Sequence, residues 1–207
     1  MPFTSLLRGA ALGAVASFAF ASAVAAAPDV GAPAPDFTVQ DSTGQTHSLS
    51  DFEGRTVVLE WTNHECPFVV KHYDAGNMQS LQKKVVEEGD VWLQVISSAP
   101  GEQGAVDGDK AASLNEERNA TPTAVLFDPT GEMGKAYGAR TTPHMYVIDP
   151  EGTLVYMGGI DSIPSSNPAD IPSATNYVRE ALQALANGSE VPNPVTRAYG
   201  CTIKYAS

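Results

Sequence analysis

The stretch TVVLEWTNHECPFVV, residues 56–70, decides the fold of this chain. Its first part, Thr56–Trp61, is β-branched and largely apolar, which is typical of a strand buried in the middle of a sheet. Pro67 suits the first turn of a helix, where a missing N–H costs nothing. The strand therefore runs through Thr62–Glu65 into a helix, and Cys66 lies at the junction.

The helix that starts at this junction shows apolar residues at helical spacing. Met78, Leu81 and Val85 continue the pattern up to Gly89. Gly76-Asn77 interrupts it, so the segment is expected to contain a kink or to be split into two helices.

Strands and helices alternate along the rest of the chain. The predicted elements are an N-terminal hairpin of Phe37–Gln40 and Gln45–Ser48, a strand Val91–Ile96, a helix around Lys110–Arg118, a strand Ala124–Phe127, a hairpin of Met145–Ile148 and Leu154–Met157, and a helix with the apolar stripe Tyr177–Leu185. This order predicts one α/β domain with a mixed central sheet flanked by helices.

The first residues are typical of a secretory signal peptide. Arg8 is followed by the uncharged, alanine-rich run Gly9–Ala27, with small residues near a cleavage point at about Ala25. A retained membrane anchor is the alternative, but Gly, Ser and Ala dilute the run and no basic residue follows it. We expect residues 1–27 to be a cleaved leader. Residues 28–207, including a docked C-terminal tail, are expected to form a periplasmic or secreted domain without membrane attachment.

The charge of the chain excludes two classes of partner. Twelve Lys and Arg residues face 24 Asp and Glu residues, for a net charge of −12, and loss of Arg8 with the leader makes it one unit more negative. Nucleic acid and anionic lipid surfaces repel such a protein.

The chain has two cysteines, Cys66 and Cys201. A thiol reacts as its thiolate, which the positive end of a helix stabilises, so Cys66 is the candidate nucleophile and a buried inert cysteine is the alternative. An oxidising compartment would permit a disulfide between the two, but the sequence leaves their pairing open. The sequence contains no CxxC pair of the kind that a structural zinc site needs.

A second feature is Thr141-Thr142-Pro143, directly before the predicted strand Met145–Ile148. With the order of elements, and with Asn63–Val69, Tyr137–Arg140 and Gly200–Tyr205, it makes the chain resemble the thioredoxin superfamily, in particular the peroxiredoxin-like redoxins related to alkyl hydroperoxide reductase and thiol-specific antioxidant proteins.

The resemblance implies a thioredoxin-like fold with a cis peptide bond before Pro143, beside Cys66. It also implies a thiol peroxidase, in which Cys66 attacks a peroxide and becomes a sulfenic acid. Cys201 is then either the resolving thiol or part of a static disulfide or an unpaired core cysteine. Peroxide or disulfide substrates and an external thiol reductant are the implied partners, with no cofactor and no metal.

Further site residues follow from the same resemblance. Thr62, Asn63 and His64 are candidates to donate hydrogen bonds to the thiolate or the peroxide, and Arg140 is the candidate cationic group. Arg140 as a surface residue and His64 as a solvated residue are the alternatives.

Three positions depart from the motifs of the family. Val69 stands where a thioredoxin-type oxidoreductase has its second cysteine, and Leu59 and Asn63 stand where the peroxiredoxin signature has Pro and Thr. The fold is therefore better supported than the peroxidase activity.

Two other classes of function remain. In a copper-binding protein, Cys66, His64, His144 and Met145 would supply sulfur and imidazole ligands, although Val69 and Val70 provide no second cysteine. A non-catalytic binding protein would leave Cys66 unreactive.

Overall fold

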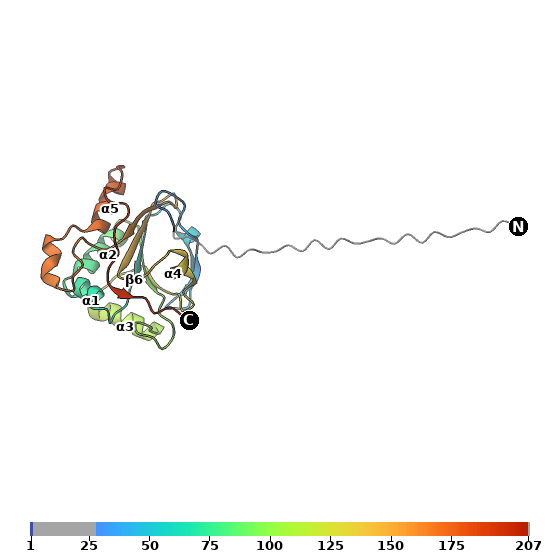
Figure 1. Ribbon diagram of the computed structural model, residues 1–207, viewed down its shortest axis with the longest axis horizontal. Helices are drawn as coiled ribbons and strands as arrows, with labels where there is room; N and C mark the ends of the chain where they lie inside the picture. Colours follow the sequence, from blue (N-terminus) through green and yellow to red (C-terminus); the bar gives the residue numbers. More distant parts are fainter. Residues whose placement is uncertain (2–27, 207) are drawn as a thin grey trace.

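The computed structural model describes residue 1 and residues 28–206. Residues 2–27 of the expected leader therefore lie outside the described residues. The chain from Pro28 onward forms a mixed seven-stranded sheet with helices on both faces (Figure 1). The expected α/β, thioredoxin-like architecture with an N-terminal hairpin is confirmed.

The sheet has the strand order β2-β1-β5-β4-β3-β7-β8. Its strands are β1 (Thr38–Asp41), β2 (Thr46–Ser48), β3 (Val57–Trp61), β4 (Val91–Ile96), β5 (Ala124–Phe127), β7 (His144–Ile148) and β8 (Leu154–Gly158). Strands β3, β4 and β5 are parallel, whereas β7 runs antiparallel to β3, and β1 antiparallel to β5. The predicted strand that precedes Cys66 is thus central, between β4 and β7.

In the part of the chain that the structure describes, five α-helices and two short 3-10 helices surround the sheet. They are α1 (Pro67–Asp74), α2 (Asn77–Glu87), α3 (Gly108–Arg118), α4 (Glu132–Ala136), α5 (Tyr177–Ala186), η1 (Leu49–Phe52) and η2 (Pro168–Ser173). Helices α1, α2 and α5 cover one face, and α4 lies on the other (Figure 1). None of the helices in the described part is long and apolar enough to cross a membrane.

Alternation along the central strands divides the core into two layers. Val58 and Met145 point towards α1, α2 and α5, whereas Leu59, Trp61 and Tyr146 point to the opposite face. All five are fully buried. Cys66 belongs to the first layer.

The helix after Pro67 is split, which is one of the two outcomes expected from the sequence. Gly76 adopts a left-handed conformation with φ +67° between α1 and α2. Five short elements were not predicted: helix α4, the 3-10 helices η1 and η2, and the two-residue strands β6 (Thr141–Thr142) and β9 (Cys201–Thr202). Each is too short to show a hydrophobic period.

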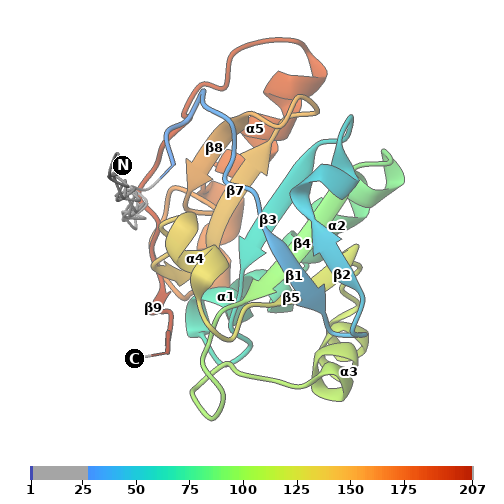
Figure 2. The same ribbon diagram turned by 90° about the vertical axis from the view of Figure 1, so that its right-hand side faces the viewer.

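The C-terminal tail packs on the domain through this last pair of strands. β9 pairs antiparallel with β6, with Cys201 opposite Thr142 and Thr202 opposite Thr141. Figure 2 shows β9 near the start of α1, so the tail reaches the junction between β3 and α1.

Candidate functional site

The junction between β3 and α1 is built from local backbone hydrogen bonds. The N–H of Cys66 donates to the carbonyl oxygen of Asn63 at 3.1 Å, and the N–H groups of Val69 and Val70 donate to the carbonyl oxygen of Cys66 at 2.9 Å. Cys66 is the N-cap residue of α1, with Pro67 in the first turn. Its side chain therefore lies at the positive end of the helix, as expected from the sequence.

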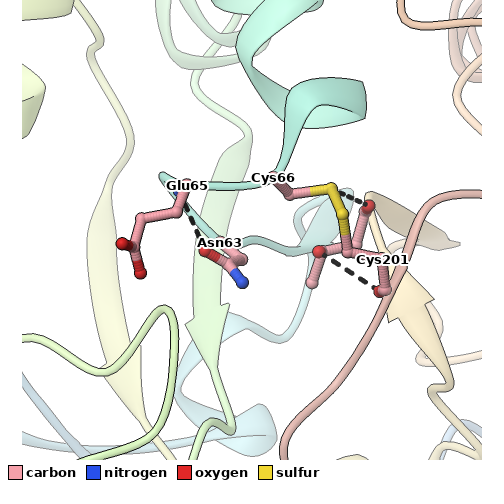
Figure 3. Close-up of a disulfide and its surroundings, with 5 residues drawn as sticks. Asn63, Glu65, Cys66 and Cys201 are labelled. Atoms are coloured by element: carbon pink, nitrogen blue, oxygen red, sulfur yellow. Dashed lines mark hydrogen bonds between the residues drawn. A yellow bond between two sulfur atoms is a disulfide. The ribbon is translucent and has the colours of Figure 1, made fainter.

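Cys66 and Cys201 form a disulfide (Figure 3). Their Cα atoms lie 5.9 Å apart although 135 positions separate them in the sequence. Cys66 is fully buried, whereas Cys201 is partly exposed. The disulfide thus links the N-terminus of helix α1 to the C-terminal tail.

The loop before β7 is the third segment of the site, after the β3–α1 junction and the C-terminal tail. The Thr142–Pro143 peptide bond is cis, as the resemblance implies. The sulfur of Cys66 lies 3.1 Å from the carbonyl oxygen of Thr142. A disulfide sulfur carries no proton, so this contact becomes a hydrogen bond only when Cys66 is a thiol, which then donates to the carbonyl.

Asn63 is the polar residue of the junction that lies beside the disulfide. Its side-chain oxygen accepts a hydrogen bond from the N–H of Glu65 at 2.9 Å, which fixes the turn before Cys66 (Figure 3). The Glu65 carboxylate in turn accepts from the N–H of Gly104 at 2.9 Å. This hydrogen bond connects the loop after β4, which contains Gly104, to the turn before Cys66.

Thr62 and His64 point into a small cavity of about 20 Å³ that Arg118 of α3 also lines. Arg118 donates a hydrogen bond to the carbonyl oxygen of His64 at 3.0 Å. Burial lowers the pKa of His64; the charge of Glu65 opposes this shift, and the charge of Arg118 adds to it. The structure thus places these two side chains against α3, and no hydrogen bond within the described part links them to Cys66.

Arg140 and His144 lie at another pocket, of about 410 Å³, between β7 and the tail. The backbone N–H of Arg140 donates to Nδ1 of His144 at 3.3 Å, and its side chain is exposed. The ring of His144 packs on Tyr146, on the sheet face opposite the layer of Cys66. Burial lowers the pKa of His144 to about 4, and the charge of Arg140 acts in the same direction.

The structure therefore brings together Cys66, Cys201, Pro143 and Asn63 of the predicted site residues. It does not bring the other three to this centre: Thr62 and His64 lie against α3, and Arg140 lies at the pocket between β7 and the tail. The described residues contain no group of three His, Cys, Asp or Glu side chains placed to hold a metal ion.

Sequence reasoning missed two buried polar clusters. In the first, Glu60 accepts hydrogen bonds from Tyr73 at 2.8 and 3.0 Å, from Trp92 at 2.9 Å and from Gln82 at 3.3 Å. Burial raises the pKa of this carboxyl, and the hydrogen bonds oppose the rise. A charged residue inside the apolar run Thr56–Trp61 was the available signal.

The second cluster contains Lys71 and His72 of α1, Asp161 and Tyr199, all buried. Lys71-His72 directly follows the apolar Phe68–Val70 in the sequence. Adjacent residues of a helix point in different directions, so two adjacent polar residues cannot both avoid the core when the helix is covered on several sides. The adjacent pair Lys71-His72 was the available signal.

Comparison with known proteins places this site in a family context. The model of the AhpC/TSA family matches residues 30–157. Chloroplastic peroxiredoxin Q of Oryza sativa subsp. japonica is 29% identical over 136 residues, which cover 61% of this chain and 57% of the rice protein. The thiol-disulfide oxidoreductase ResA of Geobacillus thermodenitrificans is 27% identical over 132 residues, 60% of this chain and 66% of that protein. The match thus spans less than two thirds of either relative.

A solved structure supports the fold over a larger part of the chain. The crystal structure of a hypothetical protein from Sinorhizobium meliloti 1021 superposes with a TM-score of 0.73 at 23% identity, covering 88% of this chain and 97% of that one. The family match includes Cys66 and Pro143 and ends before Cys201. Since the family model covers more than half of the chain, the protein belongs to the AhpC/TSA family.

Proposed function

We propose that this protein is an exported thiol peroxidase in which Cys66 is the nucleophile and Cys201 the resolving thiol. The Cys66 thiolate attacks one oxygen of a peroxide, the O–O bond breaks, and the leaving oxygen departs as water or an alcohol after taking up a proton. The Cys201 thiolate then attacks the sulfur of the sulfenic acid, hydroxide leaves and is protonated to water, and the disulfide forms. An external dithiol reduces the disulfide and is itself oxidised.

The observation that carries this proposal is the Cys66–Cys201 bond at the N-terminus of α1. The helix end stabilises the Cys66 thiolate both as an attacking group and as a leaving group during reduction. After reduction, the Thr142 carbonyl oxygen at 3.1 Å from the same sulfur can accept a hydrogen bond from the Cys66 thiol, but not from its thiolate. The family match over residues 30–157 supports thiol chemistry at Cys66.

Two cysteine variants test the proposal. With a peroxide and a thiol reductant, Cys66→Ser is expected to lose turnover, because no thiolate remains at the helix end. Cys201→Ser is expected to keep the first oxidation, seen by mass spectrometry as a sulfenic acid on Cys66, and to recycle slowly. Full turnover in Cys66→Ser would rule out the peroxidase.

Thiol–disulfide exchange is the second candidate function. Cys201 is partly exposed while Cys66 is fully buried, so an external thiolate approaches the disulfide from the side of Cys201 and releases the Cys66 thiolate. A comparison of turnover with a peroxide and with a small disulfide separates the two activities.

Export is part of the proposal, since the pair Cys66–Cys201 suits an oxidising compartment. N-terminal sequencing of protein recovered outside the cytoplasm is expected to start near Ala25–Ala27. A mature chain that begins at Met1 would contradict the leader.

A further inference from the structure

Four buried polar side chains connect helix α1 to the C-terminal tail. We call them the tail anchor: Lys71 and His72 of α1, Asp161 after β8, and Tyr199 of the tail. Their exposed fractions are 1%, 0%, 3% and 9%. Burial of a charged group costs free energy unless the group is paired. The hydrogen bonds and ion pairs of the tail anchor therefore show what stabilises these side chains in the core.

Asp161 is the centre of the tail anchor. The hydroxyl of Tyr199 donates a hydrogen bond to one carboxylate oxygen of Asp161, and the backbone N–H of Ile163 donates to the same oxygen at 3.1 Å. The Nζ atom of Lys71 lies 3.5 Å from the other oxygen and also donates to the carbonyl oxygen of Ile163 at 3.2 Å. The same Nζ atom lies 5.4 Å from the centre of the Tyr199 ring. The tail is thereby tied to α1 through one carboxylate.

The protonation of His72 follows from its neighbours. Asn176 donates to the side-chain oxygen of Asn77 at 3.2 Å, so the amide nitrogen of Asn77 faces Nδ1 of His72 at 2.9 Å and donates to it. The ring proton of neutral His72 is therefore on Nε2, which lies 3.5 Å from the Tyr199 oxygen and 3.7 Å from Asp161. Burial lowers the pKa of His72 to about 4, against the opposing effect of Asp161.

At neutral pH, Lys71 is then the cation that balances Asp161 within the tail anchor, and Tyr199 is the residue of the tail that donates to this carboxylate. If the Tyr199 hydroxyl were removed, the buried carboxylate would lose a charge-assisted hydrogen bond and keep only the backbone N–H of Ile163 on that oxygen. The link between the tail and Asp161 thus depends on a single hydroxyl, two residues before Cys201.

We propose that the tail anchor positions Cys201 against Cys66, so that the tail stays docked when the disulfide is reduced. After Cys201 in the sequence, the N–H of Ile203 donates to the carbonyl oxygen of Arg140 at 3.1 Å. The hydroxyl of Tyr205 donates to the carbonyl oxygen of Ala139 at 2.8 Å. Cys201 is held from both sides, which keeps a high effective concentration of its thiol at Cys66. Tyr199 and Asp161 are positioning residues, and their role rests on the proposed redox pair.

The thiol–disulfide equilibrium separates positioning from stability. A purely structural hydrogen bond stabilises the oxidised and the reduced protein equally, so its loss leaves the equilibrium constant of the pair unchanged. A positioning bond favours closure of the disulfide, and its loss lowers that constant.

The experiment uses the full exported chain in dithiothreitol buffers. One dithiothreitol transfers two electrons to the Cys66–Cys201 disulfide, giving two protein thiols and cyclic oxidised dithiothreitol. Asp161→Ala leaves Lys71 buried without a partner and risks unfolding. Tyr199→Phe keeps the ring against Phe68 and removes only the hydroxyl.

We expect Tyr199→Phe to lower the equilibrium constant for disulfide formation about tenfold, which corresponds to a potential about 30 mV less negative. Tyr137→Phe is the matched control, because this buried hydroxyl donates to Pro35 on the other sheet face. It is expected to leave the constant unchanged. In the reduced Tyr199→Phe protein, amide exchange in residues 199–203 is expected to accelerate.

Two outcomes would contradict the inference, and they differ. If Tyr199→Phe is folded and has the wild-type constant, the tail anchor is only structural and the proposed redox pair stands. If the disulfide of the wild-type protein resists dithiothreitol, the pair is static, and both the proposed function and the positioning role fail.

Discussion

Gly200 lies so close to Thr142 that a β-carbon on Gly200 would come within 2.0 Å of the Thr142 carbonyl oxygen. Gly200 also has φ +136°, in the range that favours glycine. The tail can therefore approach the loop of Pro143 only with glycine at this position. The next residue is Cys201, so this close approach sets the place of the second sulfur.

Gly200→Ala is expected to push the tail away from Thr142 and to disfavour the disulfide by about 1–3 kcal/mol, as overpacking does elsewhere. The fraction of free thiols at a fixed dithiothreitol ratio measures this effect. Gly188→Ala is the control, since Gly188 has φ +62° but a β-carbon there would meet no atom of the described residues within 4 Å. An equal fraction of free thiols in both variants would show that the close approach is unimportant.

Reduction of the disulfide is expected to lower the free energy of unfolding. The bond closes a loop of 135 residues, and the chain-entropy account gives about 5 kcal/mol for a loop of this length. Urea unfolding with and without dithiothreitol measures the difference. The Cys66→Ser, Cys201→Ser double variant is expected to match the reduced protein, and a double variant as stable as the oxidised protein would contradict this account.

The fold could be predicted because its signals are local. The apolar run Thr56–Trp61, followed by Pro67, marks a buried strand and a helix start within a dozen residues. The position of Cys66 at the helix end follows directly from these two signals. Gly76 similarly indicated where the helix breaks.

The second half of the site could not be predicted, because it depends on contacts between distant segments. β9 has two residues and no period, so nothing local shows that Cys201 pairs with Thr142. The same holds for Asp161 and Tyr199, whose partners on α1 lie about 90 or more positions away in the sequence. Thr62 and His64 lie against α3 because of the direction of their side chains, and residue type alone does not specify that direction.

The buried pair of Lys71 and Asp161 allows a test of stability. Asp161→Asn is expected to lower the free energy of unfolding by about 3–5 kcal/mol, because the Lys71 ammonium is left buried without a counter-charge. The double variant Lys71→Met, Asp161→Asn is expected to recover much of this loss. Urea unfolding of the oxidised proteins provides the values.

An exposed pair serves as the control for this comparison. Lys83 and Glu87 lie 3.7 Å apart on α2 with side chains 69% and 66% exposed. Lys83→Met is expected to leave the free energy of unfolding nearly unchanged, since solvent screens such pairs. If Asp161→Asn behaved like Lys83→Met, the buried pair would contribute nothing specific to the fold.

Glu60 is expected to give the protein a distinct dependence of stability on pH. Burial raises the pKa of its carboxyl above the ordinary value of 4.5. Below pH 4.5 the carboxyl is protonated in both the folded and the unfolded chain. As the pH rises, the unfolded chain ionises first, and the free energy of unfolding falls until the pH passes the pKa of the folded state.

Glu60→Gln removes this contribution while it keeps the size of the side chain. The difference in free energy of unfolding, wild type minus variant, is therefore expected to fall as the pH increases from 4.5 and to level off above the folded pKa. Urea unfolding at several pH values gives this difference, in which the other carboxyl groups cancel. A difference that rises with pH would mean that the hydrogen bonds from Tyr73, Trp92 and Gln82 outweigh burial and hold Glu60 ionised.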